Sequence, residues 1–455
     1  MMLSDRLLKS WKEEYGERLI LDTERLPDYF RDASEIKIRP SAIIFAESED
    51  DVVSVINDCR EEKIPIVFRG AGTGYTGGSV PVPNGIVLSL QHLRKLEIDI
   101  AKKLAYCGPG VITIELMKKG ESVGLFYPPD PASYDESCLG GNVAECAGGL
   151  HCKKYGVTKD YIIGLRGVTI AGEIIKTGIY ADGELFNLAG ALIGSEGLLF
   201  AITEIACRLI DLPETGRTIL AAFDKPENAA RTVSEITRQG IVPSVMEFMD
   251  GDSVACSNQY EKSLDIDSAA AILLFETMGQ GAAEQASKIQ QICHDYQASY
   301  LKSDNDPVVT EKLWKVRRNL SKAVKASAEQ KISEDVCVPS SKLPELVKFV
   351  DQLNREYPVR INSYGHAGDG NLHVNFLVSG NDKNIDTIIA EGTRRLFDKT
   401  LELGGTLTGE HGIGLTKKDF LPLEFDRPTL AAMEAIKGVF DPENFLNPGK
   451  MFLTK

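Results

Sequence analysis

The chain has 455 residues, of which 43% are hydrophobic and 26% are charged. This is the composition of a soluble globular protein that is long enough for two or three domains. The formal net charge of −15 argues against a nucleic-acid-binding protein, which needs a basic surface, but permits a small anionic substrate at a locally positive site.

Targeting and metal-cluster signals are missing from the sequence. No apolar run approaches the length of a membrane-spanning helix, and the N-terminus has no signal-peptide pattern. The nine cysteines include no Cys-x-x-Cys pair, which argues against an iron–sulfur cluster or a zinc ribbon. We therefore expect a cytoplasmic protein with reduced thiols.

The first part of the chain alternates predicted helices and strands. Ser48 is expected to be a helix N-cap, because Asp51 then supplies an acidic residue to the first turn. The elements predicted in order are short charged helices over residues 3–36, a strand over 41–46, the helix that begins at Ser48, and strands over 64–68 and 85–90.

The rest of the chain changes character at a turn-rich segment, residues 211–216, which indicates a domain boundary. Beyond it, strands and long helices alternate to about residue 378, as in an α+β domain. Residues 385–440 are predicted to be mainly helical, with an interruption over 404–414.

A glycine-rich loop, residues 69–78, follows the second predicted strand. Gly72, Gly74 and Gly77 fit the dinucleotide-binding pattern G-x-G-x-x-G, but that pattern requires a helix directly after the loop. Pro81 and Pro83 prevent a regular helix there, so we reject a Rossmann fold. Consecutive N–H groups of the loop can still cradle a phosphate, and a simple turn is the alternative.

A second glycine-rich stretch runs from residue 139 to 155. The segment Tyr127-Pro128-Pro129-Asp130-Pro131 before it is extended and rigid, because each proline restricts the residue that precedes it. So many small residues allow a planar ring to lie against bare backbone, whereas the alternative is a tightly packed loop without a ligand. Two such stretches in one domain favour one extended ligand.

Three of the six histidines lie in two glycine loops near the C-terminus. His366 and His373 belong to residues 365–373, and His411 follows Glu410 in residues 409–412. Histidine and glutamate bind divalent metals, and a further histidine can transfer a proton. We predict a metal-assisted acid/base centre; the alternative is a set of imidazoles that only hold loops together.

Several motifs resemble the FAD domain of the vanillyl-alcohol oxidase superfamily. They lie at residues 69–73, 127–131, 140–142, 154–157 and 194–197. The two histidine loops, with Phe440-Asp441-Pro442 and Asn447-Pro448-Gly449-Lys450, resemble the FAD-linked 2-hydroxy-acid dehydrogenase branch of that superfamily. This branch includes the glycolate oxidase D subunit, D-lactate dehydrogenase and D-2-hydroxyglutarate dehydrogenase, and the resemblance covers the chain from about residue 38 to its end.

The resemblance implies an α+β fold. An N-terminal helical segment over residues 1–36 would precede a PCMH-type FAD-binding domain of two subdomains over residues 37–213. Residues 214–455 would form an α+β cap domain that holds the substrate, with a C-terminal helical segment that returns to the flavin.

The resemblance also implies the site residues. His366, His373 and Glu410 match metal ligands, for which we expect Zn²⁺, with Fe²⁺ or Mn²⁺ as alternatives. His411 matches the catalytic base, and Arg317 matches an arginine that binds the substrate carboxylate. The FAD is expected to be non-covalent, because the first glycine loop lacks the histidine that tethers FAD in some relatives. Its expected contacts are Arg69, Gly70, Ala71, Gly72, Thr73, Gly74, Tyr75, Gly77, Gly78, Pro109, Gly110, Val111, Pro129, Asp130, Ser133, Gly140, Gly141, Asn142, Gly148, Gly149, Tyr155, Gly156, Val157, Ile202 and Asn447.

The implied function is the FAD-dependent oxidation of a small D-2-hydroxy acid, such as glycolate or D-lactate, to the 2-oxo acid. The hydride would go to flavin N5 and the proton to His411. The alternatives are an O₂-using alcohol oxidase and a flavin-bearing electron-transfer subunit of a larger complex. The electrons would leave to a separate acceptor: an iron–sulfur subunit, an electron-transfer flavoprotein, a quinone or O₂. The chain would act as a homodimer or as a subunit of a complex, in the cytoplasm or peripherally at the inner membrane.

Two departures from the family pattern limit this reading. The family usually has Gly-Tyr-Asp-Leu where this chain has Leu185-Phe186-Asn187-Leu188. The resemblance therefore does not predict the structure of this part of the flavin site. Ser333-Glu334-Asp335-Val336 lies where some relatives carry a lysine that assists substrate binding, which leaves the exact substrate open.

Overall fold

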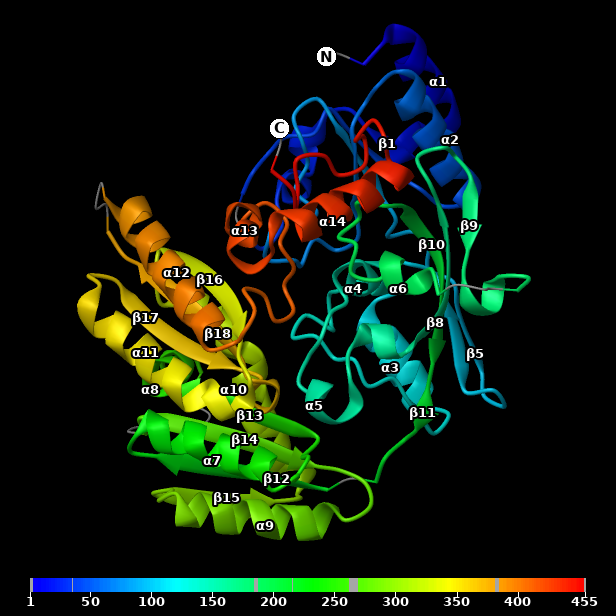
Figure 1. The fold of residues 1–455 in the computed structure, drawn as a ribbon. Coiled ribbons are helices and arrows are strands. Elements are labelled where there is room, and N and C mark those ends of the chain that lie inside the picture. Colours follow the sequence, from blue (N-terminus) through cyan, green and yellow to red (C-terminus); the bar gives the residue numbers. More distant parts are fainter. Residues whose placement is uncertain are drawn as a thin grey trace. The chain divides into compact units, whose positions relative to one another are not determined.

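The computed structural model describes residues 3–34, 36–183, 187–214, 216–261, 269–380 and 384–453. Contacts between residues divide the chain into two units. Unit 1 consists of Met1–Gly148, Val157–Leu212 and Glu410–Lys455, and unit 2 consists of Gly149–Gly156 and Pro213–Gly409. Each unit mixes helices and strands, which confirms the α+β expectation (Figure 1).

Unit 1 contains two main sheets and a short strand pair. The first sheet has the order β1-β2-β4-β3, in which β2, β4 and β3 are parallel. The second is antiparallel and has the order β5-β6-β10-β8-β9. The strands are β1 (Leu19–Ile20), β2 (Ala42–Phe45), β3 (Ile66–Arg69), β4 (Ile86–Ser89), β5 (Leu96–Asp99), β6 (Leu104–Cys107), β8 (Ile162–Val168), β9 (Ile174–Lys176) and β10 (Ala201–Arg208), with β7 (Leu125–Phe126) paired to β11 (Ile210–Asp211).

The helices of unit 1 pack on these sheets through apolar side chains. Buried residues of α1 and α2, such as Trp11 and Ile56, share one core with Ile44, Ile86 and Leu446. The helices are α1 (Asp5–Tyr15), α2 (Glu49–Glu61), α3 (Thr113–Glu121), α4 (Leu139–Glu145), α6 (Ala189–Leu192), α13 (Leu421–Glu424) and α14 (Arg427–Phe440).

Local sequence signals gave the start of this unit correctly. The predicted strands are β2, β3 and β4. Ser48 caps α2, since its side chain accepts from the Asp51 N–H at 3.1 Å while the Asp51 carboxylate accepts from the Ser48 N–H at 3.2 Å. Helix α4 lies in the second glycine stretch, where no helix was predicted, since its two glycines have low helix propensity. The Asn142 amide donates to Thr113 Oγ1 at 2.7 Å.

Unit 2 is built on one antiparallel sheet with the strand order β15-β12-β14-β13-β17-β18-β16. Its strands are β12 (Arg217–Phe223), β13 (Val245–Asp250), β14 (Ala271–Thr277), β15 (Tyr300–Asp304), β16 (Gln330–Cys337), β17 (Arg360–Gly365) and β18 (Asn371–Val378). Its helices are α5 (Cys152–Tyr155), α7 (Pro226–Arg238), α8 (Gly251–Tyr260), α9 (Ala282–Asp295), α10 (Pro307–Ala326), α11 (Leu343–Glu356) and α12 (Ile385–Glu402).

Two helices of unit 2 cover one face of the sheet. Leu220 and Ala222, which alternate along β12, pack with Val254 of α8 and with Leu313 and Val316 of α10. Helix α7 contacts α9 and α11, and α11 contacts α12; all four contact strands of the same sheet. Because side chains alternate across a strand, both faces of the sheet are available to apolar contacts, which explains why β18 is buried along its whole length.

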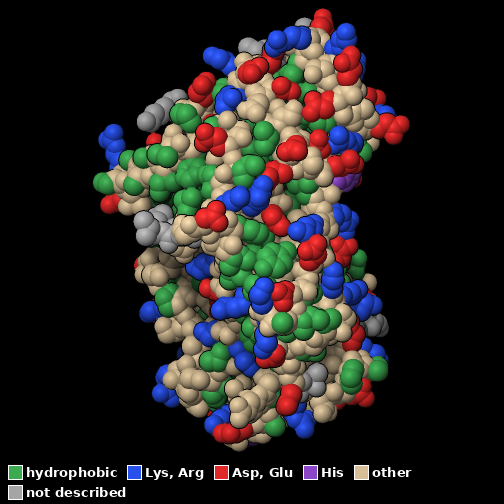
Figure 2. Space-filling view, turned by 90° about the vertical axis from the view of Figure 1, so that its right-hand side faces the viewer, with side chains coloured by type: hydrophobic (Ala, Val, Ile, Leu, Met, Phe, Trp, Pro, Cys, Tyr) green, Lys and Arg blue, Asp and Glu red, His purple; other side chains and the backbone are tan. Residues whose placement is uncertain are grey.

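The surface view in Figure 2 shows acidic and basic side chains interspersed on the face that it presents. Among the described helices, none combines the length and the apolar character needed to cross a membrane.

Candidate functional site

The first glycine loop begins where β3 ends at Arg69, and its backbone needs glycine. Gly72 has φ +73°, and a Cβ there would lie 2.0 Å from Arg69 Nη2. The Arg69 guanidinium is buried and donates to the carbonyls of Arg31 at 2.8 Å and Asp28 at 2.9 Å. Arg69 was predicted to contact FAD. Its side chain has a structural role in this structure, because it anchors the N-terminal segment to the glycine loop.

Residues near the C-terminus donate hydrogen bonds to the carbonyl groups of this loop. Thr76 O accepts from Leu415 N at 2.7 Å. Gly78 O accepts from Lys450 Nζ at 2.7 Å and from the Asn447 amide at 2.9 Å. Because these carbonyls are already bonded, the loop is held rigidly for binding through its N–H groups.

Lys450 belongs to a cluster of buried charges behind the loop. Its Nζ also donates to Val80 O at 2.6 Å. Burial lowers the pKa of Lys450 to about 7, and the carboxylates of Asp32, Glu145 and Glu196 oppose that shift. Glu196 in turn accepts from the N–H groups of residues 413 and 414 at 2.8 and 2.7 Å. The C-terminal segments and the glycine loop thus share one electrostatic network.

Two acceptors of this region are buried without a donor among the described residues: Asp32 Oδ2 and Glu145 Oε2. Asp32 Oδ2 lies 4.0 Å from the position of a Cβ on Gly74, and Glu145 Oε1 lies 2.9 Å from that of a Cβ on Gly78. Buried acceptors of this kind are satisfied by a partner that carries hydroxyl or N–H donors.

His411 lies against the first glycine loop, within unit 1. Its ring stacks on Tyr75 with 4.7 Å between centroids and 20° between planes. Its carbonyl accepts from Thr76 Oγ1 at 3.1 Å, and its Nε2 lies 3.9 Å from Glu410 Oε1. The predicted base and the predicted phosphate loop are therefore neighbours.

Other predicted FAD contacts also pack together in unit 1. Gly140 N donates to Pro109 O at 2.9 Å, and a Cβ on Gly140 would lie 2.5 Å from Pro109 Cβ. Gly149, Tyr155 and Gly156 instead belong to unit 2, where α5 is held by Lys154, whose Nζ contacts Ser244 Oγ at 3.4 Å. The remaining predicted contacts, from Pro129 to Gly148, Val157, Ile202 and Asn447, lie in unit 1. Leu185 and Phe186 of the first departure lie outside the described residues.

His366 lies at the turn between β17 and β18 of unit 2, and His373 lies near the start of β18. The turn requires Gly370, which has φ +79° and where a Cβ would lie 1.8 Å from Val338 O. The two rings are perpendicular, with centroids 5.4 Å apart. Both histidines are buried, so the two predicted metal ligands of this loop are close together.

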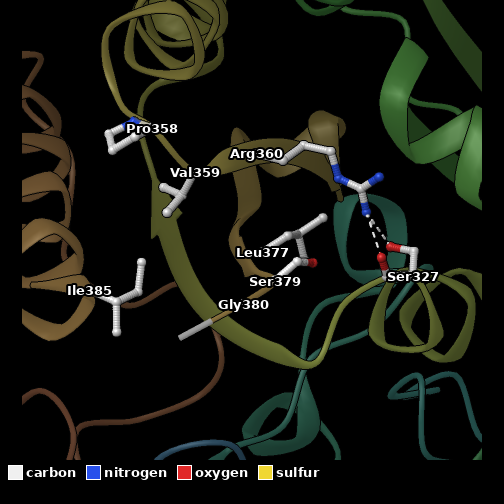
Figure 3. Close-up of a pocket in the computed structure, with 8 residues that line it drawn as sticks. All are labelled: Ser327, Pro358, Val359, Arg360, Leu377, Ser379, Gly380 and Ile385. Carbon is white, nitrogen blue, oxygen red and sulfur yellow. Dashed lines mark hydrogen bonds between the residues drawn. The ribbon is translucent and has the colours of Figure 1, made fainter. Parts of the chain in front are cut away.

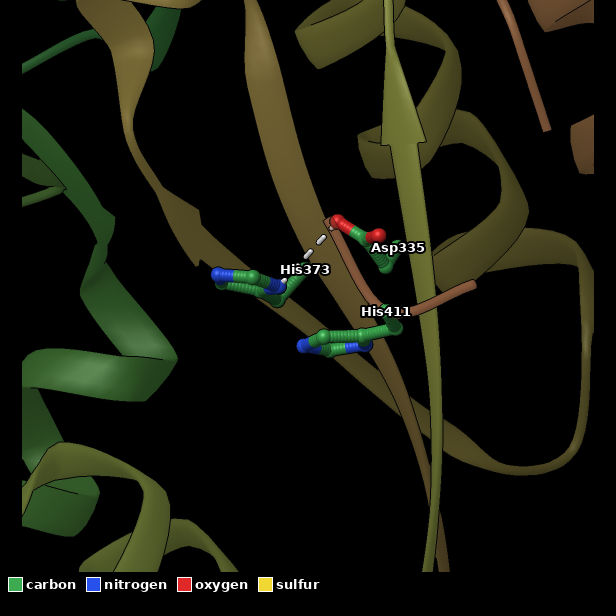
Figure 4. Close-up of side chains that lie close together, drawn as sticks. All are labelled: Asp335, His373 and His411. Carbon is green, nitrogen blue, oxygen red and sulfur yellow. Dashed lines mark ion pairs between the residues drawn. The ribbon is translucent and has the colours of Figure 1, made fainter. Parts of the chain in front are cut away.

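Each of these histidines faces a fully buried carboxylate. His366 Nδ1 lies 2.8 Å from Glu247 Oε1, and His373 Nδ1 lies 3.5 Å from Asp335 Oδ1 (Figure 4). Burial alone would raise the pKa of Glu247, but Arg317 and His366 outweigh it and hold that pKa below its ordinary value.

Arg317, the predicted substrate arginine, is on α10 and is buried. Its Nε donates to Glu247 Oε2 at 2.6 Å, and its guanidinium lies 5.2 Å from the centroid of the Tyr364 ring. The pairing with Glu247 was not foreseen, because no local pattern connects residues that are far apart in the sequence.

A second cation beside Tyr364 was missed. Lys331 Nζ lies 3.4 Å from Tyr364 Oη and 2.9 Å from Ser321 Oγ. Burial would raise the pKa of Tyr364, but Lys331 and other neighbours, Arg317 among them, hold it below its ordinary value. Lys331 stands two residues before Ser333 and therefore on the same face of β16, a signal that strand alternation could have supplied.

A surface pocket of unit 2 lies apart from these residues. Arg360 turns toward Ser327 there, and Nη2 donates to Ser327 O at 3.2 Å (Figure 3). The lining consists of Ser327, Pro358, Val359, Arg360, Leu377, Ser379, Gly380 and Ile385. None of the predicted site residues lines this pocket.

Comparisons with known proteins agree with this architecture. Residues 40–178 match the family model described as FAD binding domain, and residues 212–451 match FAD linked oxidases, C-terminal domain. Glycolate oxidase subunit GlcD of Bacillus subtilis (strain 168) is 37% identical over 96% of this chain and 92% of its own length. D-lactate dehydrogenase of Anaerostipes hadrus is 32% identical over 99% of this chain and 98% of its own. A solved structure of p-cresol methylhydroxylase with substrate bound has the same fold, with a TM-score of 0.78 at 16% identity over 98% of this chain and 96% of its own.

The chain therefore belongs to the FAD-linked oxidase family and is an FAD-linked oxidoreductase. The resemblance to this family and the expected PCMH-type fold are both confirmed.

We expect Lys450→Met to weaken FAD binding roughly 10- to 100-fold, because it leaves the buried carbonyls of Gly78 and Val80 without the donor that holds this end of the loop. The measurement is the fluorescence of flavin released on dilution. Lys102→Met is the control, since Lys102 is an exposed lysine of the same unit. Equal FAD affinity in the two variants would contradict the role assigned to Lys450.

Proposed function

We propose that this chain oxidises a small D-2-hydroxy acid, such as glycolate or D-lactate, to the 2-oxo acid with FAD as hydride acceptor. The observation that carries the proposal is the buried group of unit 2 in which His366, His373 and Arg317 lie around two carboxylates. The relatives named glycolate oxidase subunit and D-lactate dehydrogenase support the same substrate class.

The residues of unit 1 fit FAD. The glycine loop from Arg69 to Gly78 would hold the pyrophosphate through its N–H groups. The buried acceptors Asp32 Oδ2 and Glu145 Oε2 suit the hydroxyl and N–H groups of the same cofactor. The other contacts would be those expected from the sequence, with Asn447 at the flavin end. When bound, FAD supplies the acceptor for the hydride. We propose that it is non-covalent, because the loop contains no histidine.

The residues of the histidine turn fit a divalent metal. A carboxylate can only accept, so the proton of a neutral His366 lies on Nδ1, toward Glu247, and Nε2 carries the lone pair that a metal requires. Asp335 Oδ1 lies 3.5 Å from His373 Nδ1, an ion-pair distance at which its charge would favour a proton on Nδ1 and leave Nε2 to a metal. We propose Glu410 as the third ligand; it directly follows Gly409, whose N–H donates to Asp335 Oδ2 at 2.8 Å. Zn²⁺ suits two imidazoles and a carboxylate, as do Fe²⁺ and Mn²⁺. A metal held there would lower the pKa of the substrate hydroxyl.

The chain's own side chains would then divide the remaining tasks. Arg317 gives its Nε to Glu247, so its two terminal nitrogens would bind the substrate carboxylate in bidentate fashion. His411 would take the proton of the hydroxyl, with its ring oriented by the stacking on Tyr75.

The electrons would leave to a separate acceptor. The sequence contains no Cys-x-x-Cys pair, so an iron–sulfur subunit, an electron-transfer flavoprotein, a quinone or O₂ would have to receive them. The relative from Bacillus subtilis is named as a subunit, which supports a partner protein.

The purified protein is expected to be yellow and to release its flavin into the supernatant on acid precipitation. Anaerobic addition of glycolate or D-lactate should bleach the oxidised flavin, whereas L-lactate should do so more slowly. Colour retained in the precipitate would contradict non-covalent FAD. A flavin that no D-2-hydroxy acid reduces would contradict the proposed reaction.

Arg317→Lys should keep a positive charge beside Glu247 but lose the bidentate contact with the substrate. Losing a charge-assisted contact costs about 1.5–3 kcal/mol, or roughly 10- to 150-fold in kcat/KM. The FAD content should stay unchanged, and Arg318→Lys, one position on, serves as the control. Equal kinetics in the two variants would assign the carboxylate-binding role to another cation, for which Lys331, which also lies beside Tyr364, is a candidate.

Glu410→Gln and His411→Ala should separate metal binding from proton transfer. Glu410→Gln is expected to lose metal and activity together. His411→Ala should keep metal and FAD while flavin reduction slows by ~10²–10⁴-fold, as general-base removal does. Elemental analysis and stopped-flow absorbance check both variants. Loss of metal from His411→Ala with retention in Glu410→Gln would reverse the two roles.

A further inference from the structure

We propose that Glu247 and Asp335 are positioning residues that set the tautomer and ring orientation of His366 and His373. This inference rests on the metal site proposed above, and neither carboxylate was among the site residues expected from the sequence.

Both oxygens of Glu247 are already engaged by protein groups, which makes the carboxylate a partner of His366 and Arg317. Oε1 faces His366 Nδ1 at 2.8 Å and Oε2 accepts from Arg317 Nε at 2.6 Å. Glu247 is fully buried on β13, and the next residue, Phe248, pairs with Gly365 at the end of β17. The strand register therefore brings the carboxylate beside the first histidine of the turn.

Asp335 lies opposite His373 in the register of β16 and β18. Its Oδ2 accepts from Gly409 N at 2.8 Å and from Thr408 Oγ1 at 3.2 Å, and its Oδ1 accepts from the Asn371 amide at 2.5 Å. These donors fix the carboxylate, and Oδ1 then lies 3.5 Å from His373 Nδ1 (Figure 4).

A carboxylate on Nδ1 has two effects on a histidine that binds a metal. It keeps the proton on Nδ1 and so exposes the Nε2 lone pair, and it makes the imidazole a stronger donor. His366 has this arrangement as a hydrogen bond of 2.8 Å. The 3.5 Å between Asp335 Oδ1 and His373 Nδ1 is an ion-pair distance, so Asp335 would favour a proton on that nitrogen through its charge.

Glu247 also joins two parts of the site. It contacts the metal-binding histidine with one oxygen and the substrate-binding arginine with the other. A change at Glu247 should therefore affect metal affinity and KM together, whereas a change at Asp335 should affect metal affinity with a smaller change in KM.

The test uses the full chain with bound FAD, stripped of metal by a chelator and titrated with Zn²⁺ or Co²⁺. Glu247→Gln and Asp335→Asn are expected to weaken metal binding roughly 10- to 100-fold. The matched control is Glu276→Gln, which removes a carboxylate from a histidine outside the site, since His151 Nε2 lies 3.3 Å from Glu276 Oε2. The control should keep the wild-type affinity.

A second measurement is independent of activity. With ¹⁵N-labelled histidine, the wild type should show Nδ1–H tautomers for His366 and His373, and each variant should show a mixed tautomer at the histidine that it faces. FAD content and circular dichroism establish folding. If Glu247→Gln does not fold, Glu247→Gln combined with Arg317→Met removes the unpaired cation and carries the same tautomer test.

The outcomes separate this inference from the proposed function. Unchanged metal affinity and tautomers in both variants would overturn the positioning role. Complete loss of metal in Asp335→Asn would make Asp335 a ligand and overturn its role as proposed. A wild type that reduces its flavin with a D-2-hydroxy acid but binds no metal would overturn the metal site and this inference, while the oxidation would stand. Weakened metal binding in the variants of a protein whose flavin no hydroxy acid reduces would support the inference and refute the reaction.

Discussion

The arrangement of unit 2 depends on one buried carboxylate, Glu247, and on its need for compensation. A carboxylate removed from water is costly unless it is paired and hydrogen-bonded. Glu247 meets this requirement with Arg317 from α10 and His366 from the turn after β17. Glu247 therefore joins β13, α10 and the turn after β17 at one point. The side chains of Arg317 and His366 are both held in place by it.

The same requirement applies to a buried amine of unit 1, Lys450. Its contacts are the carbonyls of Gly78 and Val80 and the side chain of Asn447. The loop that would bind the anionic part of FAD is thus fixed through its carbonyl groups by residues far away in the sequence. Because the loop is already rigid, it would lose little conformational entropy when FAD binds, which is the advantage of a preformed site.

Features written in neighbouring residues could be predicted from the sequence. The Ser48 cap, the strands β2, β3 and β4 and the glycine loops all follow from short patterns, and the family motifs located the histidine turn. The pairing of Glu247 with His366 could not be predicted, because it joins β13 to a turn more than a hundred residues later. Helix α4 was not predicted for a related reason: Gly140 and Gly141 have low helix propensity, and the buried contact of Asn142 with Thr113 joins residues that are far apart in the sequence.

The edge of the first sheet has a consequence for the order of folding. Ile66 N donates to Phe445 O, and Asn447 N donates to Ile66 O, both at 2.8 Å, so that Leu446 completes the sheet beside β3 and enters its core. During synthesis on the ribosome, the backbone partners of Ile66, which are Phe445 and Asn447, are added only after nearly four hundred further residues. Most of unit 2, which is one continuous stretch from Pro213 to Gly409, is complete before then. The domain that begins first is the one that closes last, and until it does, the exposed edge of β3 is open to incorrect pairing.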